Sequence, residues 1–278
     1  MSWEVVKASV IGNGHILNDI PCQDSCIVKT LDENCGIAIV ADGAGSCNNS
    51  HIGSDFVTKT GLDLFEELIL DNGWDKVLPS EEIWREKVIP IVKKVSDSLR
   101  VFSKENKYEY KSLSSTFIVT FFSNNGICSL NIGDGRGATK AFNGDWESIV
   151  TPYHGEQVGM TVFLTSDIWN NTETYISTSL KAQKTEAFII MSDGYEKISF
   201  ECYQKGDDGK YYDPNKPFSN FLNFTLKNTK NFLKNNSIEE VNKKWEQFLK
   251  NGNKILEEEM DDKSMIFGVF LDKDSIHN

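Results

Sequence analysis

Five aspartates of the sequence stand where an apolar run meets a turn. Asp42, Asp134, Asp193 and Asp261 lie in the segments Ile39–Ser46, Leu130–Arg136, Ile189–Gly194 and Met260–Ile266, and Asp24 lies in Pro21–Ser25. A single Asp-Gly after a strand usually forms only a turn, because glycine adopts positive φ and aspartate hydrogen-bonds its own backbone. Several carboxylates converging at strand ends would instead repel one another unless a cation lay between them.

Oxygen ligands of this kind suit hard divalent cations such as Mg²⁺ and Mn²⁺. Asp-Gly suits them further, because the small glycine leaves its carbonyl accessible beside the carboxylate. Two such ions close together would generate a hydroxide nucleophile and neutralise charge on a phosphoryl group. The formal net charge of −12 agrees with a cation-compensated acidic cluster, and it disfavours a protein that tracks nucleic-acid phosphates.

The cysteines and the remaining acids give weaker signals. Cys22 and Cys26 have no second Cys/His pair at zinc-site spacing, and no Cys-x5-Arg pattern follows Cys47. Asp207, Asp208 and Asp213 lack the spacing of a calcium loop. Free thiols and an exposed acidic loop are therefore the preferred interpretations.

Strand-like runs rich in Val, Ile and Phe are interspersed with two pairs of helical patterns. The predicted strands are Val5–Ile11, Cys35–Ala41, Thr116–Phe122, Ile127–Ile132, Thr161–Leu164, Ala187–Met191 and Met265–Leu271. The predicted helices are Ser50–Leu70, Ser80–Val101, Phe218–Lys234 and Ile238–Leu256, with Pro90 expected to kink or interrupt the second. This order predicts an α+β fold of antiparallel sheets with segregated helices, as one domain over residues 1–278. The polar stretch 204–218 is predicted to be an exposed loop or flap near a site.

From about Ser9 to Phe270 the sequence resembles the metal-dependent protein phosphatases of the 2C type. Members of that family have, in order, an Asp-Gly after a core strand, Gly-Asp-x-Arg, Ser-Asp-Gly and a final Asp-Asn-x-Ser/Thr. The similar segments here are Asp42-Gly43, Gly133–Arg136, Ser192–Gly194 and Asp261–Ser264. Leu113–Phe117 also looks like the Gly-x-Thr segment of the family, without its glycine. No single motif is decisive, but the ordered set is specific.

The resemblance implies a four-layer α-β-β-α sandwich and hydrolysis of phosphoserine or phosphothreonine on proteins. It implies that Asp42 bridges two Mg²⁺ or Mn²⁺ ions, with the Gly43 carbonyl on one of them. Asp193 and Asp261 would hold the second ion, and Asp24 would support a water of the metal centre.

Two further positions are interpreted through bacterial members. Asp134, together with Asp193, resembles the position of a weaker third metal in bacterial relatives. Ala44 stands where many eukaryotic members have a histidine proposed as general acid, which bacterial members often lack.

His15 and Gln23 depart from the family pattern, which has an arginine for substrate phosphate ahead of a Glu-Asp pair. His15 is either a replacement phosphate contact or a structural residue, because a histidine is cationic only when protonated. Gln23 in place of glutamate removes a charge beside Asp24. A catalytically weak regulator that binds phosphoprotein is therefore the alternative function.

The adjacent acids Asp261 and Asp262 occupy the Asp and Asn positions of the last family motif. Side chains alternate faces near the start of a strand, so we expect Asp261 to point inward as the metal ligand. Asp262 is expected to point outward, and Asp262→Asn is expected to remain active.

The expected partner is a phosphorylated protein, with a serine/threonine kinase as the opposing enzyme, and the chain is expected to be a monomer. No apolar run approaches the roughly 20 residues needed to span a bilayer. The N-terminal residues do not form a signal peptide pattern, and the cysteine usage suits the cytosol.

Overall fold

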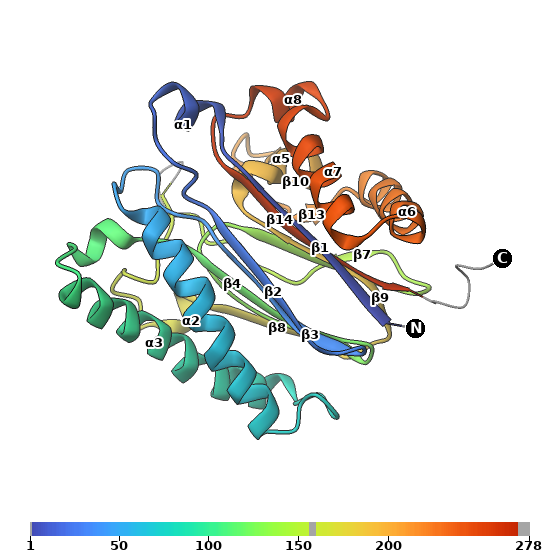
Figure 1. Ribbon diagram of the computed structural model, residues 1–278, viewed down its shortest axis with the longest axis horizontal. Coiled ribbons are helices and arrows are strands. Elements are labelled where there is room, and N and C mark those ends of the chain that lie inside the picture. Colours follow the sequence, from blue (N-terminus) through green and yellow to red (C-terminus); the bar gives the residue numbers. More distant parts are fainter. Residues whose placement is uncertain (1, 156–159, 272–278) are drawn as a thin grey trace.

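The computed structural model describes residues 2–155 and 160–271, and in them two five-stranded sheets lie face to face (Figure 1). The first sheet contains, in order, β1 (Ser2–Val10), β14 (Lys263–Leu271), β9 (Thr185–Met191), β6 (Arg136–Ala141) and β7 (Trp146–Ser148). The second contains β2 (Ser25–Asp32), β3 (Cys35–Ala41), β4 (Phe117–Ser123), β5 (Gly126–Ile132) and β8 (Ser177–Lys181). All neighbouring strands in both sheets are antiparallel.

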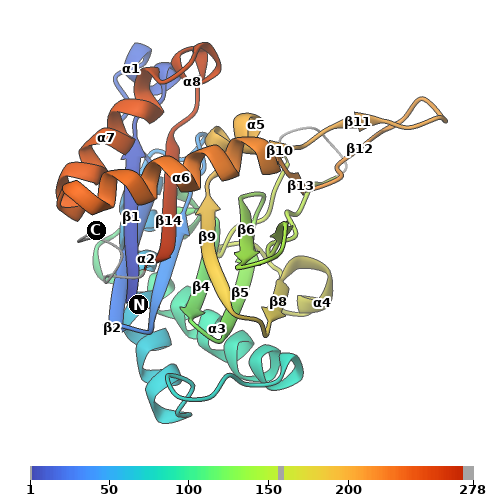
Figure 2. The same ribbon diagram turned by 90° about the vertical axis from the view of Figure 1, so that its right-hand side faces the viewer.

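Helices cover the outer face of each sheet (Figures 1 and 2). Helices α2 (Ser50–Asp71) and α3 (Glu81–Glu105) pack on the second sheet, and α6 (Ser219–Asn235) and α7 (Ile238–Asn251) pack on the first. The shorter helices are α1 (Asn13–Leu17), α4 (Thr172–Tyr175), α5 (Glu196–Ser199), α8 (Lys254–Glu258) and the 3-10 turns η1 (Tyr110–Leu113) and η2 (Asp193–Tyr195). The predicted α+β sandwich with four layers is confirmed. None of the helices in the described residues combines the length and apolarity needed to cross a membrane.

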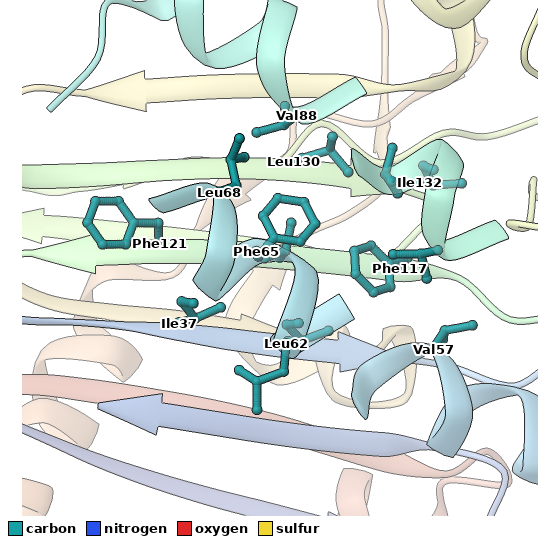
Figure 3. Packing of buried hydrophobic residues seen from close by; sticks show 14 of the residues in the cluster. Ile37, Val57, Leu62, Phe65, Leu68, Val88, Phe117, Phe121, Leu130 and Ile132 are labelled. Atoms are coloured by element: carbon teal, nitrogen blue, oxygen red, sulfur yellow. The ribbon is translucent and has the colours of Figure 1, made fainter. Parts of the chain in front are cut away.

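Apolar side chains fill both the helix–sheet layers and the space between the sheets. Leu62, Phe65 and Leu68 of α2 recur at helical spacing and pack with Phe117 and Phe121 of β4 (Figure 3). Burying each such side chain contributes about 1.5–3 kcal/mol. Between the sheets, the Trp3 ring lies 5.2–5.5 Å from the rings of Phe122, Phe188 and Phe270. The strands are thus fixed on both faces, which makes their ends rigid supports for side chains.

The strand prediction is wrong at Thr161–Leu164. This segment forms no strand, and Leu164 is held by a hydrogen bond from its N–H to the Ser115 carbonyl at 3.0 Å. Val162 and Leu164 are apolar because they are buried in the core beneath α2 and α3, so apolarity alone misled the prediction. Strands β2, β6, β7 and β8 were not predicted, because they are short or carry polar residues within the sheet.

Two helix predictions also need correction. Pro90 does not interrupt α3, which continues to Glu105 because its apolar face, including Val88 and Val92, is buried, and a kink at Pro90 stays a prediction. The last predicted helix is two helices: α7 ends at Asn251, and the Asn253 side chain then caps α8 by accepting the Leu256 N–H at 3.0 Å.

The segment predicted as a loop or flap, 204–218, lies between α5 and α6. Strand β10 (Phe200–Glu201) pairs with β13 (Lys216–Pro217), and β11 (Gln204–Lys205) pairs with β12 (Tyr211–Tyr212). We call residues 200–217 the flap hairpin. Figure 2 shows it extending away from the two sheets, with the β11–β12 end outermost. That the whole chain is a single domain stays a prediction.

Candidate metal centre

Asp42 lies one residue beyond the end of buried β3, and two backbone contacts fix it there. Its N–H donates to Thr116 Oγ1 at 2.9 Å, and its carbonyl accepts the Thr116 N–H at 2.8 Å. Gly43 follows in a bridge with Ser115, and a Cβ at position 43 would lie 2.5 Å from the Gln23 carbonyl oxygen. Glycine is therefore required by close backbone approach, and Thr116 supports the Asp42 turn.

Asp193 lies two residues beyond β9, at the start of η2. Ser192 precedes it and ties three chain segments together. The Ser192 Oγ donates to Asp24 Oδ2 at 2.8 Å and accepts the Ser264 N–H at 3.0 Å. This hydroxyl links the ends of β9 and β14 to Asp24, the residue before β2.

Asp261 and Asp262 precede β14, and the expected outward orientation of Asp262 is wrong. Asp262 is 1% exposed, and its carboxylate accepts hydrogen bonds from the N–H groups of Gly12, at 2.7 Å, and Gln23. Asp262 therefore joins the loop after β1 and the loop before β2 to the start of β14. Asp261 is half-buried, and its Oδ1 accepts the Asp262 N–H at 2.8 Å.

Asp134 completes the group from the turn between β5 and β6. Gly133 before it has φ of +117°, a backbone conformation that favours glycine. A Cβ on Gly135 after it would lie 2.7 Å from the Met191 carbonyl oxygen. Both glycines therefore serve the tight turn that presents Asp134 beside the end of β9.

The charges of all five aspartates act on one another. Burial raises the pKa of Asp42 well above its usual range, and the carboxylates of Asp24, Asp193, Asp261 and Asp134 raise it further. Burial also raises the pKa of Asp193 well above its usual range, with Asp134 and Asp261 adding to the effect. The five aspartates that the sequence nominates therefore lie near enough for the charges of several of them to interact.

The same causes act on the outer members of the group. Burial, with the charge of Asp262, raises the pKa of Asp24 to about 7. Burial, with Glu196, raises the pKa of Asp134 to about 6. Burial raises the pKa of Asp261 as well. A cluster in which every carboxylate resists ionisation is a site where positive charge would bind strongly.

His15 and Gln23 are both buried beside other parts of the protein. His15 is 9% exposed, and its Nδ1 lies 2.9 Å from Asp262 Oδ1, although the contact is not aligned as a hydrogen bond. Gln23 is 2% exposed, and its Nε2 donates to the Cys47 carbonyl at 3.0 Å. Both positions thus contribute to packing around Asp24 and Asp262.

The donor set fits a hydrated divalent cation. Within residues 2–155 and 160–271, no group of three or more His, Cys, Asp and Glu side chains is arranged so that it could hold a metal ion. Mg²⁺ does not need one, because it is commonly bound by one or two carboxylates and keeps several waters. Asp24 Oδ1 and Asp193 Oδ1 are buried and have no hydrogen-bond partner, so both have acceptor capacity for a cation or its waters.

Comparison with known proteins agrees with this geometry. The sequence profile of the family described as protein phosphatase 2C matches residues 11–250. The chain belongs to the protein phosphatase 2C family. It is therefore a serine/threonine protein phosphatase of the 2C type, in a family whose enzymes depend on metal ions.

Individual relatives support the same family and fold. The chain is 26% identical over 221 residues to serine/threonine-protein phosphatase 3 of Escherichia coli K12, covering 77% of this chain and 82% of that protein. The serine/threonine phosphatase Stp1 from Staphylococcus aureus has a similar structure, with a TM-score of 0.59 at 16% identity over 98% of this chain and 96% of that one. RsbX, solved in complex with magnesium, has a TM-score of 0.52 at 16% identity over 96% and 95% of the two chains.

Several residues around the site were not nominated from the sequence. Ser192 and Asp262 connect strand ends, and Arg136 with Glu196 forms a buried ion pair beside Asp134. Arg136 was visible as the last residue of the Gly-Asp-x-Arg segment. The partners of these residues are distant in sequence, so pattern alone offered no signal for the contacts.

Proposed function

We propose that this phosphatase removes phosphate from phosphoserine or phosphothreonine of proteins by using two Mg²⁺ or Mn²⁺ ions held by the aspartate group. Asp42 would bridge the ions with the Gly43 carbonyl on one, and Asp193 and Asp261 would bind the second. Asp134 with Asp193 would form a weaker third site. The observation that carries the proposal is the convergence of five carboxylates whose pKa values are all raised.

When bound, the ions would supply activation of a water and neutralisation of charge on the phosphoryl oxygens. The protein's own residues would hold the metal-binding carboxylates and the attacking water in place. Ser192 holds one oxygen of Asp24, and the other oxygen is left as an acceptor that can orient a water. Asp262 fixes the loops of Gly12 and Gln23, so the strand ends keep their spacing during turnover.

The alternative, a catalytically weak regulator that binds phosphoprotein, draws support from His15 and Gln23. His15 lies against Asp262 and the Gln23 Nε2 donates to the Cys47 carbonyl, whereas His15 Nδ1 and Gln23 Oε1 have no hydrogen-bond partner. The burial of His15 against Asp262 also favours its structural interpretation, and its contact with substrate phosphate stays a prediction. A phosphatase without such a side-chain contact to the substrate phosphate would show a high KM.

Phosphate release from a phosphothreonine peptide tests the proposal against the alternative. We expect turnover that requires Mn²⁺ or Mg²⁺, disappears in excess EDTA and is lost in Asp42→Asn. The Gly45→Ala variant is a matched control, because a Cβ there meets no atom within 4 Å. Peptide binding without turnover at any metal concentration would favour the regulator, and full turnover in EDTA would refute the metal centre.

The remaining predictions concern the opposing enzyme, the oligomeric state, the location and the substrate. The opposing serine/threonine kinase, the monomeric state and the cytosolic location stay predictions. A phosphorylated protein as substrate follows from the family.

A further inference from the structure

A fully buried arginine connects the Asp134 motif to the flap hairpin. Arg136 is 0% exposed, and its Nε donates to Glu196 Oε2 at 2.6 Å. Its Nη2 donates to Asp213 Oδ2 at 2.9 Å, and its Nη1 donates to Asn215 Oδ1 at 2.9 Å and Asp213 Oδ1 at 3.3 Å. One guanidinium therefore engages three side chains from two segments of the chain.

Arg136 and Glu196 each closely follow an aspartate of the candidate centre along the chain. Glu196 is three residues after Asp193, and Arg136 is two residues after Asp134. Asp213 and Asn215 lie in the flap hairpin between β12 and β13. The network thus spans from the acidic group to the base of the flap hairpin.

Asn215 makes the base of the hairpin a specific attachment. Its Nδ2 donates to the Val150 carbonyl at 2.7 Å and to Ser148 Oγ at 2.9 Å, while its N–H donates to Asp213 Oδ1 at 2.7 Å. Its φ is +46°, which asparagine tolerates better than most residues. The hairpin is therefore bound both to Arg136 and to the end of β7 with the residues that follow it.

The outer part of the flap hairpin has little support of its own. Strands β11 and β12 pair over two residues each, and Tyr211 and Tyr212 are 71% and 51% exposed. An isolated two-stranded hairpin is marginally stable in water. The orientation of the outer hairpin must therefore be set at its base.

We propose that Arg136 is a positioning residue that clamps the flap hairpin through Asp213 and Asn215 and so sets where the hairpin meets the protein part of a phosphoprotein substrate. The clamp itself follows from the contacts, whereas its effect on substrates rests on the proposed function. A hairpin that contacts the polypeptide around the phosphoryl group affects large substrates and leaves a small aryl phosphate little changed.

Hydrogen–deuterium exchange of peptides covering residues 196–218 tests the clamp without any activity. Asn215→Gly removes the Asn215 side-chain hydrogen bonds but keeps the positive φ, and Asp213→Asn removes the charge with little change of shape. We expect both variants to speed exchange at the base of the hairpin, including the Phe218 N–H bonded to the Ser199 carbonyl at 2.8 Å, by about fivefold or more. Arg136→Lys is expected to have a larger effect, since lysine cannot reproduce the fork of donors.

Two controls separate the clamp from general destabilisation. His154→Gln removes the contact of His154 Nε2 with the same Asp213, but from a side chain that is 35% exposed, and is expected to leave exchange nearly unchanged. Arg85→Lys disturbs an arginine of α3 that hydrogen-bonds Glu173 of α4, the Ile176 carbonyl and Thr178 of β8, and is expected to leave exchange in residues 196–218 unchanged. Unchanged exchange in both Asn215→Gly and Asp213→Asn, or faster exchange spread evenly over the chain, would overturn the proposal.

The kinetic arm uses a phosphothreonine peptide and p-nitrophenyl phosphate with Mn²⁺. In Asn215→Gly we expect KM for the peptide to rise severalfold while the kinetics with p-nitrophenyl phosphate stay within about twofold of the unmodified protein. Equal losses on both substrates would overturn the role in substrate positioning. A wild-type protein that hydrolyses neither substrate would refute the proposed function, and exchange would still decide whether the clamp exists.

Discussion

We expect the replacement of Asp262 by asparagine to destabilise the folded protein, because the Asp262 carboxylate joins two loops to the start of β14. The family motif has asparagine at this position, so the pattern predicts tolerance. In the structure, however, the two oxygens of Asp262 accept N–H groups from separate loops, those of Gly12 and Gln23. Asparagine has one acceptor oxygen, and its NH₂ group would face one of these donors.

The expected destabilisation follows from this mismatch. Losing a charge-assisted hydrogen bond costs about 1.5–3 kcal/mol, and leaving a buried donor unpaired costs about 1–3 kcal/mol. Removing the charge of Asp262 relieves its repulsion with Asp24 and Asp261, which offsets part of the loss. We therefore expect Asp262→Asn to lower the free energy of unfolding by about 2–4 kcal/mol in metal-free solution.

Urea unfolding in EDTA, followed by tryptophan fluorescence, measures this difference. Asp261→Asn is the matched neighbour, because its carbonyl oxygen keeps the hydrogen bond from the residue 262 N–H while the substitution removes a destabilising charge. We expect Asp261→Asn to be at least as stable as the unmodified protein and inactive, with Asp262→Asn less stable. Equal stability of Asp262→Asn and the unmodified protein would refute the anchoring role of Asp262.

Two further predictions concern charge and close packing. The pKa values of Asp24 and Asp134 are raised by folding, to about 7 and about 6, so the folded state binds more protons than the unfolded state in this range. The free energy of unfolding in EDTA should therefore fall as pH rises from about 5 to 8, and saturating Mn²⁺ should abolish the decline. Urea titrations at several pH values measure both effects. A free energy of unfolding that rises with pH in EDTA would contradict this prediction. A Cβ at position 194 would lie 2.0 Å from the Asp262 carbonyl oxygen. Gly194→Ala should therefore lower the melting temperature by several degrees in a calorimetric scan, whereas Gly45→Ala should not. Equal melting temperatures of the two variants would show that the backbone around position 194 shifts without cost.

The sandwich could be predicted because its central elements are long and strongly patterned. Strands such as β3 and β4 are entirely buried and rich in Val, Ile and Phe, and α2 carries a regular apolar stripe. Strands β6 and β8 lack that pattern because they carry mainly small and polar residues, and they join the sheets by pairing with β9 and β5. Local composition cannot report such pairing.

The aspartates could be nominated because each follows or precedes a strand within a recognisable segment. Their grouping depends on both sheets ending at the same edge, which the motif order implied only through resemblance. The burial of Asp262 and the reach of Arg136 to Asp213 join residues far apart along the chain. These contacts are set by tertiary packing, which alternation of side chains along one strand does not describe.

We propose above that the aspartate group binds two divalent ions through Asp42. Equilibrium dialysis against Mn²⁺, with bound ions counted by electron paramagnetic resonance, tests it most directly. We expect two tightly bound ions per chain and a marked loss of binding in Asp42→Asn, with binding by Gly45→Ala unchanged. Binding of no ions, or equal binding by the Asp42→Asn variant and the unmodified protein, would contradict it.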